Sequence, residues 1–552
     1  MIRIRYIHFI VLALTMLLFQ ACQDLDDLNI NPNGVDPEDA DPSLLLATVI
    51  TQTGQIVVDL GFGHLAGVMQ HTQLDGWSGS HNNYNWDNDS HSWRNQYSIL
   101  RNVQELYTKA DEMDLLFYKG VALVMEAYLF GMITDLWGDA PFSAALHGDL
   151  EGSENVKPVF DPQQEIYLGI IDKLTEANLL LSGDKKDYES VNATQDVLYH
   201  GDIEKWQKLA NSLTIRYYMR ISEKEPTLAR AAINNIVANP DKYPLILEAE
   251  EDASVKYIGN SSADSWPSNT KFDISEDGKY FRTKLCATLV DTLQAFNDPR
   301  LAVWASPVEY PLVLDPSLPD NGDTIIDNMR YIARNVADNY ESTTGYPLDY
   351  DPEYVGLPPS CSFAPVYNLN PNLGQGLYNP HASQLNEMYK ESAGPMLQAR
   401  LISSAEVNFT LAEAAYLGWI PRSASGYYKA GVKASLQAWG VGSVYDDYIS
   451  GVPYAGLEEI MFQKWIASWT AAAESWFDYR RTGLPELQTG EASSRPVLPL
   501  RFYYHQKDEI DLNEENANAA IAELEATEYT APDSRNSAWS KMWLLQGTGK
   551  PY

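Results

Sequence analysis

The stretch from Leu457 to Pro485, LEEIMFQKWIASWTAAAESWFDYRRTGLP, decides the fold. Its apolar residues recur at steps of three and four along the chain; they are Met461, Trp465, Trp469, Ala472 and Trp476. That spacing places them on one face of a helix, so the segment is predicted to be one continuous helix of about seven turns. A helix with so apolar a face has to be buried, and its three tryptophans are therefore predicted to belong to the core.

The sequence also predicts where this helix ends. Gly483 supplies the left-handed position that closes many helices, and Pro485 prevents the helix from restarting. Arg480 and Arg481 fall in the last turn, where they complement the negative helix terminus. Asp478, about one turn earlier, is placed to hold one guanidinium in a bidentate pair. We interpret these charges as structural, with catalysis as the less favoured alternative.

The pattern E-x(n)-W-F-D-x-R-R-T-G-x-P on a late helix resembles the signature of the SusD/RagB family of outer-membrane nutrient-binding lipoproteins, in particular its SusD-like branch. Other segments resemble the same family in the expected order along nearly the whole chain. They are LWGDAP at 136–141, YHGDIEKW at 199–206, ANSL at 210–213, YVGLP at 354–358 and SAEVNFTLAEA at 404–414.

The first 21 residues are typical of an export signal. Arg3 and Arg5 precede an apolar run that ends at Phe19, which is too short for a stable membrane anchor, and a small residue follows at Ala21. Cys22 then suggests a bacterial lipoprotein, although Phe19 and Gln20 depart from the usual residues before such a cysteine. The alternative is a plain signal peptide with a coincidental cysteine. We predict a signal peptide at 1–21 and a lipid anchor, such as palmitate, on Cys22.

Residues 22–42 are acidic and rich in turn formers, which predicts a tether and no packed element. The whole chain carries 75 acidic against 39 basic residues, for a formal net charge of −36. Such acidity argues against binding nucleic acid or anionic lipid. No linker of Gly, Ser or Pro divides the rest of the chain, so residues 43–552 are predicted to form a single domain.

Amphipathic helical patterns dominate the first half of the chain and return near its end. They cover residues 118–137, 165–181, 203–221, 405–418 and 424–439. Helices of this length separated by short loops look like tetratricopeptide pairs, although no strict 34-residue repeat is legible. The predicted fold is mainly α: a SusD-like helical fold with tetratricopeptide-like helix pairs and long inserted loops.

The motifs of metal and phosphate chemistry are missing from the sequence. None of the nine histidines has the spacing of a zinc site, and no nucleophile elbow or phosphate-binding loop occurs. Cys286 and Cys361 could pair in an oxidising compartment but need not. Residues 87–89 and 320–323 resemble fragments of calcium loops, for which solvated turns are the favoured interpretation. We therefore expect no catalytic residues, no metal and no cofactor.

Three long stretches without helical or strand period, at 75–93, 259–281 and 341–378, are predicted to be the loops that carry the site. Aromatic rings interleaved with Asn and Asp suit sugars, which present apolar faces and polar edges. The first stretch fits best, and loop packing is its equal alternative. The predicted ligand-binding residues are Trp77, Asn83, Tyr84, Asn85, Trp86 and Asp87, with Trp266 and Tyr346 as weaker candidates.

The resemblance implies a non-enzymatic lipoprotein on the outer face of the outer membrane. Such proteins cover a SusC-like TonB-dependent transporter barrel and capture a glycan or, in some members, a peptide. The sequence therefore predicts a glycan-binding protein that delivers its ligand to that barrel. Two alternatives stay open, namely a peptide-binding protein of the same architecture and a surface glycan hydrolase.

Overall fold

The computed structural model describes residues 41–75, 78–148, 150, 152–188, 191–275, 278–361 and 379–552. The predicted signal peptide, Cys22 and nearly all of the predicted tether lie outside this part of the chain. Helix α2 (Pro42–Val58) starts one residue before the predicted domain start. Asp41 caps it, since the Asp41 side chain accepts a hydrogen bond from the Ser43 N–H at 2.9 Å.

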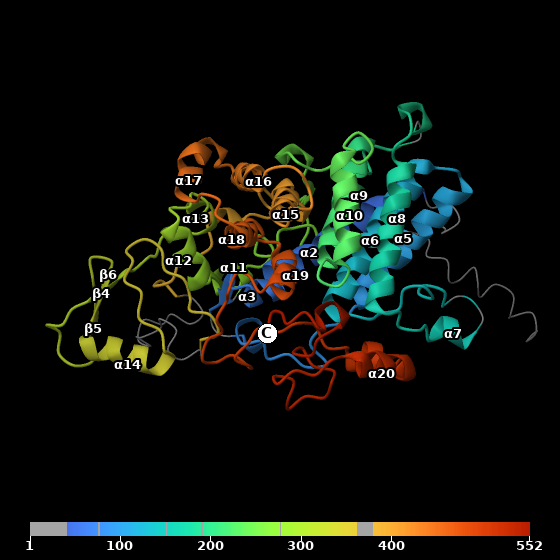
Figure 1. Cartoon of the computed structure of the whole chain (residues 1–552). Helices are drawn as coiled ribbons and strands as arrows, with labels where there is room; N and C mark the ends of the chain where they lie inside the picture. Colours follow the sequence, from blue (N-terminus) through green and yellow to red (C-terminus); the bar gives the residue numbers. More distant parts are fainter. Residues whose placement is uncertain are drawn as a thin grey trace, which may run out of the picture.

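About half of the chain is helical and strands are few, which confirms the predicted mainly α, SusD-like fold. The other long helices are α5 (Arg94–Glu112), α6 (Leu116–Trp137), α8 (Gln163–Leu180), α9 (Ile203–Arg220), α10 (Pro226–Ala238), α15 (Ser404–Tyr416) and α16 (Ala424–Ala438). Consecutive helices pack as pairs, α5 on α6, α8 on α9 and α15 on α16 (Figure 1). The five predicted helices are confirmed to within two residues at each end.

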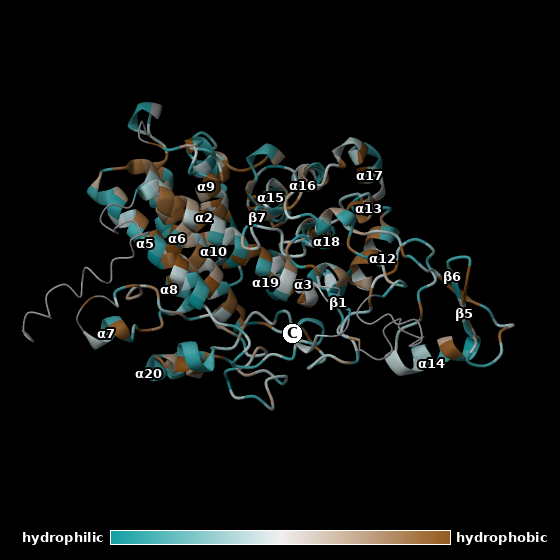
Figure 2. Ribbon diagram, turned by 180° about the vertical axis from the view of Figure 1, so that it is seen from behind, coloured by the Kyte–Doolittle hydropathy of each residue, from teal (hydrophilic) through white to brown (hydrophobic). Residues whose placement is uncertain are grey.

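Helix α6 is the centre of the first group of helices. By length and composition both α6 and the helical run Pro42–Val68 could cross a membrane, but 83% of the most apolar window of α6 is buried within the fold. Seen from behind, Figure 2 shows hydrophobic residues gathered on α6 and the helices around it. Burial on all sides explains why α6 is hydrophobic around its whole circumference. It is a core helix.

Residues 457–482 form two helices, α18 (Leu457–Ala467) and α19 (Ala472–Thr482), so the prediction of one continuous helix is wrong. Thr470 adopts a φ of 69° in the turn between them. The reason is a neighbouring backbone: a Cβ on Gly61 would lie 2.6 Å from the Thr470 carbonyl oxygen, so another helical segment crosses at the break. That segment is a π-helical turn, η3 (Asp59–His64), followed by α3 (Leu65–Val68).

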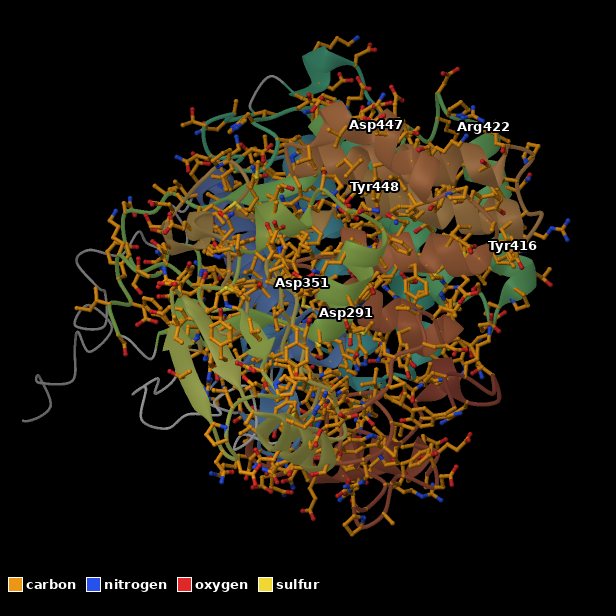
Figure 3. All side chains as sticks on the ribbon, turned by 90° about the vertical axis from the view of Figure 1, so that its left-hand side faces the viewer. Asp291, Asp351, Tyr416, Arg422, Asp447 and Tyr448 are labelled. Atoms are coloured by element: carbon orange, nitrogen blue, oxygen red, sulfur yellow. The ribbon has the colours of Figure 1, made fainter. Side chains whose placement is uncertain are left out.

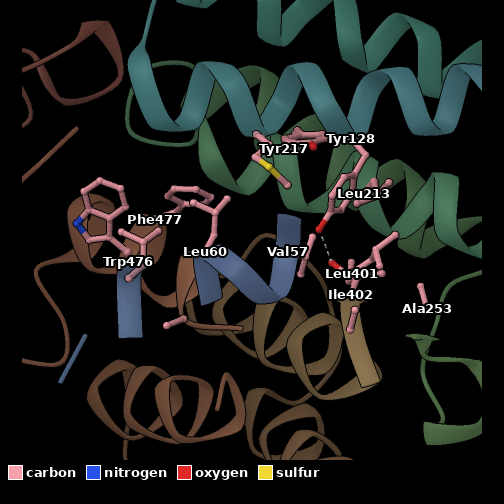
Figure 4. Packing of buried hydrophobic residues seen from close by; sticks show 14 of the residues in the cluster. Val57, Leu60, Tyr128, Leu213, Tyr217, Ala253, Leu401, Ile402, Trp476 and Phe477 are labelled. Carbon is pink, nitrogen blue, oxygen red and sulfur yellow. Dashed lines mark hydrogen bonds between the residues drawn. The ribbon is translucent and has the colours of Figure 1, made fainter. Parts of the chain in front are cut away.

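The predicted core tryptophans of this segment are confirmed. Trp465, Trp469 and Trp476 are each at most 1% exposed. Helix α19 ends at Gly483 with a φ of 78°, in agreement with the predicted left-handed stop. Figure 4 shows Trp476 and Phe477 next to Leu60 of η3. Tyr128 of α6 and Tyr217 of α9 lie above them in this view.

The last turn of α19 belongs to a buried set of ion pairs. The bidentate partner of Arg481 is Glu413 of α15, at 2.5 and 2.7 Å, whereas Asp478 makes a single contact with Arg481 at 3.1 Å. The prediction of Asp478 as a bidentate partner is therefore wrong. Asp478 also pairs with Lys464 at 2.7 Å. Although burial opposes ionisation, Lys464 and Arg481 hold the pKa of Asp478 well below its usual range.

Three small sheets connect the helical groups. Strand β1 (Thr72–Leu74) pairs with β3 (Thr283–Leu285), and β2 (Ala253–Lys256) pairs with β7 (Gln398–Ile402), both antiparallel. Strand β6 (Met329–Ile332) lies between β4 (Leu312–Leu314), which is parallel to it, and β5 (Asp323–Ile326), which is antiparallel. With α14 (Arg334–Thr344) the last sheet forms a separate small hydrophobic cluster, at the left edge of Figure 1.

The remaining helices are short and lie mostly in the connections. They are α4 (Gly79–Asn82), α7 (Ser153–Val156), α11 (Lys279–Arg282), α12 (Ala287–Ala295), α13 (Leu301–Trp304), α17 (Tyr445–Gly451) and α20 (Glu514–Glu523). Cys286 and Cys361 are both buried and no disulfide joins them, so the two cysteines do not pair with each other.

Candidate functional site

The loop that carries the main site prediction is attached to the core by its own aromatic rings. Tyr84 is fully buried and Trp86 is 6% exposed. The Trp86 indole N–H donates to the Ser80 carbonyl at 2.8 Å, and its ring packs edge-on against Trp476 and Phe502. In this conformation neither ring offers a free face to a ligand. The structure thus favours the loop-packing interpretation for these two residues.

The polar residues of the same loop hold turns together. The Asn83 carbonyl accepts a hydrogen bond from the Ser494 N–H at 2.8 Å, and the exposed Asn85 accepts one from the Ser494 hydroxyl. The Asp87 carboxylate accepts from the N–H of the residue two positions later, at 3.0 Å. Trp77 lies outside the described residues and stays a prediction.

The two weaker candidates lie apart from each other. Trp266 is fully buried in an aromatic cluster, with ring centroids 5.2 Å from Phe62 and 5.6 Å from Tyr257. Tyr346 is half-buried, and its hydroxyl donates to the Pro359 carbonyl at 3.3 Å. Burial raises the pKa of Tyr346 to about 12. Among the described candidates, Tyr84, Trp86 and Trp266 are buried, so the structure does not gather these rings on one exposed surface.

Of the calcium-like fragments, residues 87–89 lie in an exposed turn, as favoured by the sequence, whereas the second runs from a turn into strand β5 at Asp323. Asp323 forms an ion pair with Arg330 at 2.6 Å. Among the described residues no group of three or more His, Cys, Asp and Glu side chains is arranged to hold a metal ion. Asp291 and Asp351 lie near each other in Figure 3, and partial burial together with Asp349 and Asp351 raises the pKa of Asp291 to about 6.

A cavity of about 930 Å³, which we call the cleft, is lined by segments from both halves of the chain. Its walls come from α2, from the start of α9, from both strands of the β2–β7 sheet and from residues 437–443, at the end of α16 and just after it. Figure 2 shows β7 between α2 and α10 on one side and α15 on the other. The volume suits a ligand of several sugar or amino-acid units.

The pairing of the two strands explains why polar side chains line the cleft. Ser254 pairs with Arg400, and Lys256 pairs with Gln398, so these four side chains project from one face of the sheet. The residue between them on β2, Val255, projects from the other face. There the sheet packs so closely on α2 that a Cβ on Gly54 would lie 3.2 Å from that of Val255. All four polar residues line the cleft, as do Val255 and Ala399 between them.

Arg400 is the most deeply buried cation of the cleft, at 9% exposure. Its guanidinium lies 4.3 Å from the centre of the Trp439 ring. Its hydrogen bonds are long: 3.3 Å to the Met396 carbonyl, 3.4 Å to the Gln398 carbonyl and 3.5 Å to the Thr470 hydroxyl. Burial lowers the pKa of Arg400, and the charge of Asp252 opposes that shift.

A second cavity of about 460 Å³ adjoins the cleft. Gln55 of α2 and Tyr257 line both cavities, so the half-buried Tyr257 ring stands where the two meet. The far wall of the second cavity is the start of α5, together with residues 262–267. The two cavities together form a depression long enough for an extended ligand.

Sequence reasoning missed the cleft. Its cations come from strands of four and five residues, 253–256 and 398–402, which are too short for a period-2 pattern to stand out. Their meeting depends on contacts between segments far apart in the chain. The alternation of polar and apolar residues in ASVK and QARLI was the one available signal.

The chain belongs to a family of SusD-like proteins whose family model is described as starch-binding and associating with the outer membrane. The match covers residues 36–311 and 366–505, which is most of the chain. This confirms the resemblance found in the sequence. No curated protein matches the chain.

Solved structures share the fold. A chitin-binding protein superposes with a TM-score of 0.70 at 23% identity, over 91% of this chain and 99% of its own. A SusD homologue from Bacteroides fragilis gives 0.67 at 22% identity, over 92% and 100%. A SusD-like protein from Bacteroides thetaiotaomicron gives 0.64 at 18% identity, over 91% and 98%. At such identities these likenesses establish the fold alone.

Proposed function

We propose that this protein is a lipid-anchored binding protein of the bacterial cell surface that captures an oligosaccharide and delivers it to a SusC-like TonB-dependent transporter barrel. Membership of a starch-binding, outer-membrane family supports the class of function. The observation that carries the proposal for this chain is the cleft, whose volume of about 930 Å³ accommodates several sugar rings.

The lining of the cleft suits sugars. Tyr257 offers an aromatic ring for the apolar face of a pyranose. Gln55, Gln398 and Gln437 line the same cavity and carry amides that both donate and accept, as sugar hydroxyls require. The lining therefore offers a binding surface of the mixed apolar and polar kind that oligosaccharides need.

Calorimetry on the purified mature protein with a panel of oligosaccharides tests the capture step. We expect at least one glycan of three to six units to bind with micromolar affinity, about −8 kcal/mol, and no product to be released on incubation. Release of shorter sugars would favour the hydrolase. Binding of peptides without any glycan would favour the peptide-binding alternative.

The anchor is tested separately through Cys22. Cys22→Ser is expected to move the protein from the membrane fraction into the soluble fraction and to abolish labelling with a palmitate analogue, because two or three acyl chains are needed for stable attachment. Membrane-bound, unlabelled wild-type protein would contradict the anchor.

Delivery requires a physical partner in the outer membrane. A tagged wild-type protein, extracted in mild detergent, is expected to co-purify with a TonB-dependent barrel. Protease treatment of intact cells is expected to digest the protein, since it faces the exterior. Protection from protease in intact cells would place it on the inner face and would contradict delivery from outside.

A further inference from the structure

Arg400 differs from the other buried arginines of the described chain in how its charge is compensated. Five of them have a carboxylate at 3.3 Å or closer; these are Arg216, Arg220, Arg300, Arg330 and Arg481. Two more, Arg480 and Arg501, donate to carbonyls at 2.7 to 3.1 Å. Arg400 has no carboxylate within ion-pair distance among the described residues, and its shortest hydrogen bond is 3.3 Å.

A buried guanidinium that is compensated so weakly is costly unless something else supplies its partner. The Arg400 side chain lines the cleft, so a ligand in the cleft can reach it. A planar carboxylate is the group that matches the guanidinium fork, because two parallel N–H···O bonds form at once. The environment of Arg400 therefore favours a ligand that carries a carboxylate.

Two further cations line the same cavity. Lys256 projects from the same sheet face as Arg400, is exposed, and has no described ion-pair partner. Lys205, at the start of α9, also lines the cavity; its ammonium donates to the Glu250 carbonyl at 2.7 Å and lies 5.8 Å from the centre of the Tyr199 ring. The lining thus holds three cations beside three carboxylates, whereas the whole chain carries 75 acidic against 39 basic residues.

Two of the three acidic residues of the lining already have hydrogen-bond donors. Asp252 accepts from the Ser404 N–H at 2.6 Å, and Asp264 accepts from the Ser261 hydroxyl at 3.0 Å. Glu250 is exposed at the rim. No described carboxylate lies within ion-pair distance of Arg400, so its guanidinium fork can take a ligand group, with which the charge of Asp252 competes at longer range.

We propose that the cleft selects acidic oligosaccharides, namely chains that contain hexuronate units, and that it seats one uronate carboxylate on Arg400. Lys256 attracts a second carboxylate further along the chain. Gln398 and Ser254, from the same sheet face, bind hydroxyls, and the Tyr257 ring covers one sugar face. The inference rests on the proposed function, since it names the class of glycan that the cleft takes.

The test compares an oligogalacturonate with its fully methyl-esterified form, which keeps size, linkage and hydroxyls but removes the charge. Titration calorimetry with the wild-type mature protein is expected to show at least tenfold tighter binding of the acid. Arg400→Gln should abolish that preference, and Lys256→Glu should reduce it about fivefold or more. Lys433→Gln, an exposed lysine of α16 that does not line the cleft, is the matched control and should bind as the wild type does.

Melting curves accompany each variant, and the exposed Lys256→Glu decides the question if Arg400→Gln fails to fold. Equal binding of the acid and its ester would overturn the inference, as would a Lys256→Glu variant with wild-type acid preference. Binding of neutral oligosaccharides with no uronate binding would also overturn it, but would leave the proposed function standing. If neither sugar class bound and a polyglutamate peptide did, the proposed function would fail together with the inference.

Discussion

The loop at 78–93 and the cleft contain similar kinds of residues but use them differently. In the loop, the rings of Tyr84 and Trp86 are buried, and Trp86 donates its N–H to the Ser80 carbonyl within the loop itself. In the cleft, Tyr257 stands half-buried beside an open cavity, and Arg400 lacks a close partner. Aromatic and polar content alone therefore does not mark a binding site. What separates the two regions is whether the protein itself already satisfies the side chains.

The largest expected effect concerns Trp86. Trp86→Ala should lower the free energy of unfolding by about 3–5 kcal/mol, because it leaves a cavity beside Trp476 and Phe502. Chemical denaturation measures this change, and Trp86→Phe should cost clearly less because it keeps a ring. A variant that melted normally but lost ligand binding would show that Trp86 contacts the ligand, and would contradict the assignment of its ring to the core.

The next effect concerns the cleft. Tyr257→Ala should weaken oligosaccharide binding about tenfold, or about 1.4 kcal/mol, through loss of the stacking ring. Tyr257→Phe keeps the ring and should bind nearly as the wild type does. Because Tyr257 also packs against Trp266, the melting temperature has to be measured in parallel. Wild-type affinity in a folded Tyr257→Ala protein would place the sugar elsewhere.

A smaller effect is expected from pH. Burial raises the pKa of Asp252 to about 6, while the Ser404 donors and then the charge of Arg400 oppose that shift and nearby Glu250 adds to it. Below this pKa Asp252 is neutral; above it the carboxylate competes with a ligand for Arg400. Affinity for an oligogalacturonate should therefore fall about two- to fivefold as the pH rises from about 5 to about 7.

Asp252→Asn provides the control for this pH dependence. The variant should bind the acid with an affinity that changes less over the same range, because the carboxyl whose charge acts on Arg400 is then removed. Calorimetry at three pH values in buffers of equal ionic strength measures it. Tighter binding at the higher pH in the wild type would contradict the sign of this prediction.

The smallest effect is expected from substitutions outside the cleft. The double variant Asn85→Ala, Tyr346→Ala should change affinity for a ligand of the cleft less than about twofold, since neither of these described residues is among those that line it. A tenfold loss with an unchanged melting temperature would show that the loop carries the site, as the sequence predicts. Affinity electrophoresis with the same glycans is sufficient for this measurement.

The long helices of the fold could be predicted because their signals are local. Residues 203–220 repeat apolar side chains with the helical period, residues 116–137 form one long apolar run, and Gly138 and Gly483 mark two helix ends. The break between α18 and α19 could not be predicted, since it depends on Gly61 crossing at Thr470. The bidentate partner of Arg481 was likewise out of reach, because Glu413 comes from a helix 68 residues earlier.

The sequence by itself determined the family, the mainly helical architecture and the burial of Trp465, Trp469 and Trp476, since motif spacing and apolar period act within one segment. Only the tertiary structure decided which polar and aromatic side chains remain open to a ligand. Trp86 was closed off by Trp476 and Phe502, and Arg400 was left lining a cavity by the pairing of β7 with β2. The physical reason is that the solvation and pairing of a side chain are set by its neighbours in space, and these come from distant parts of the chain.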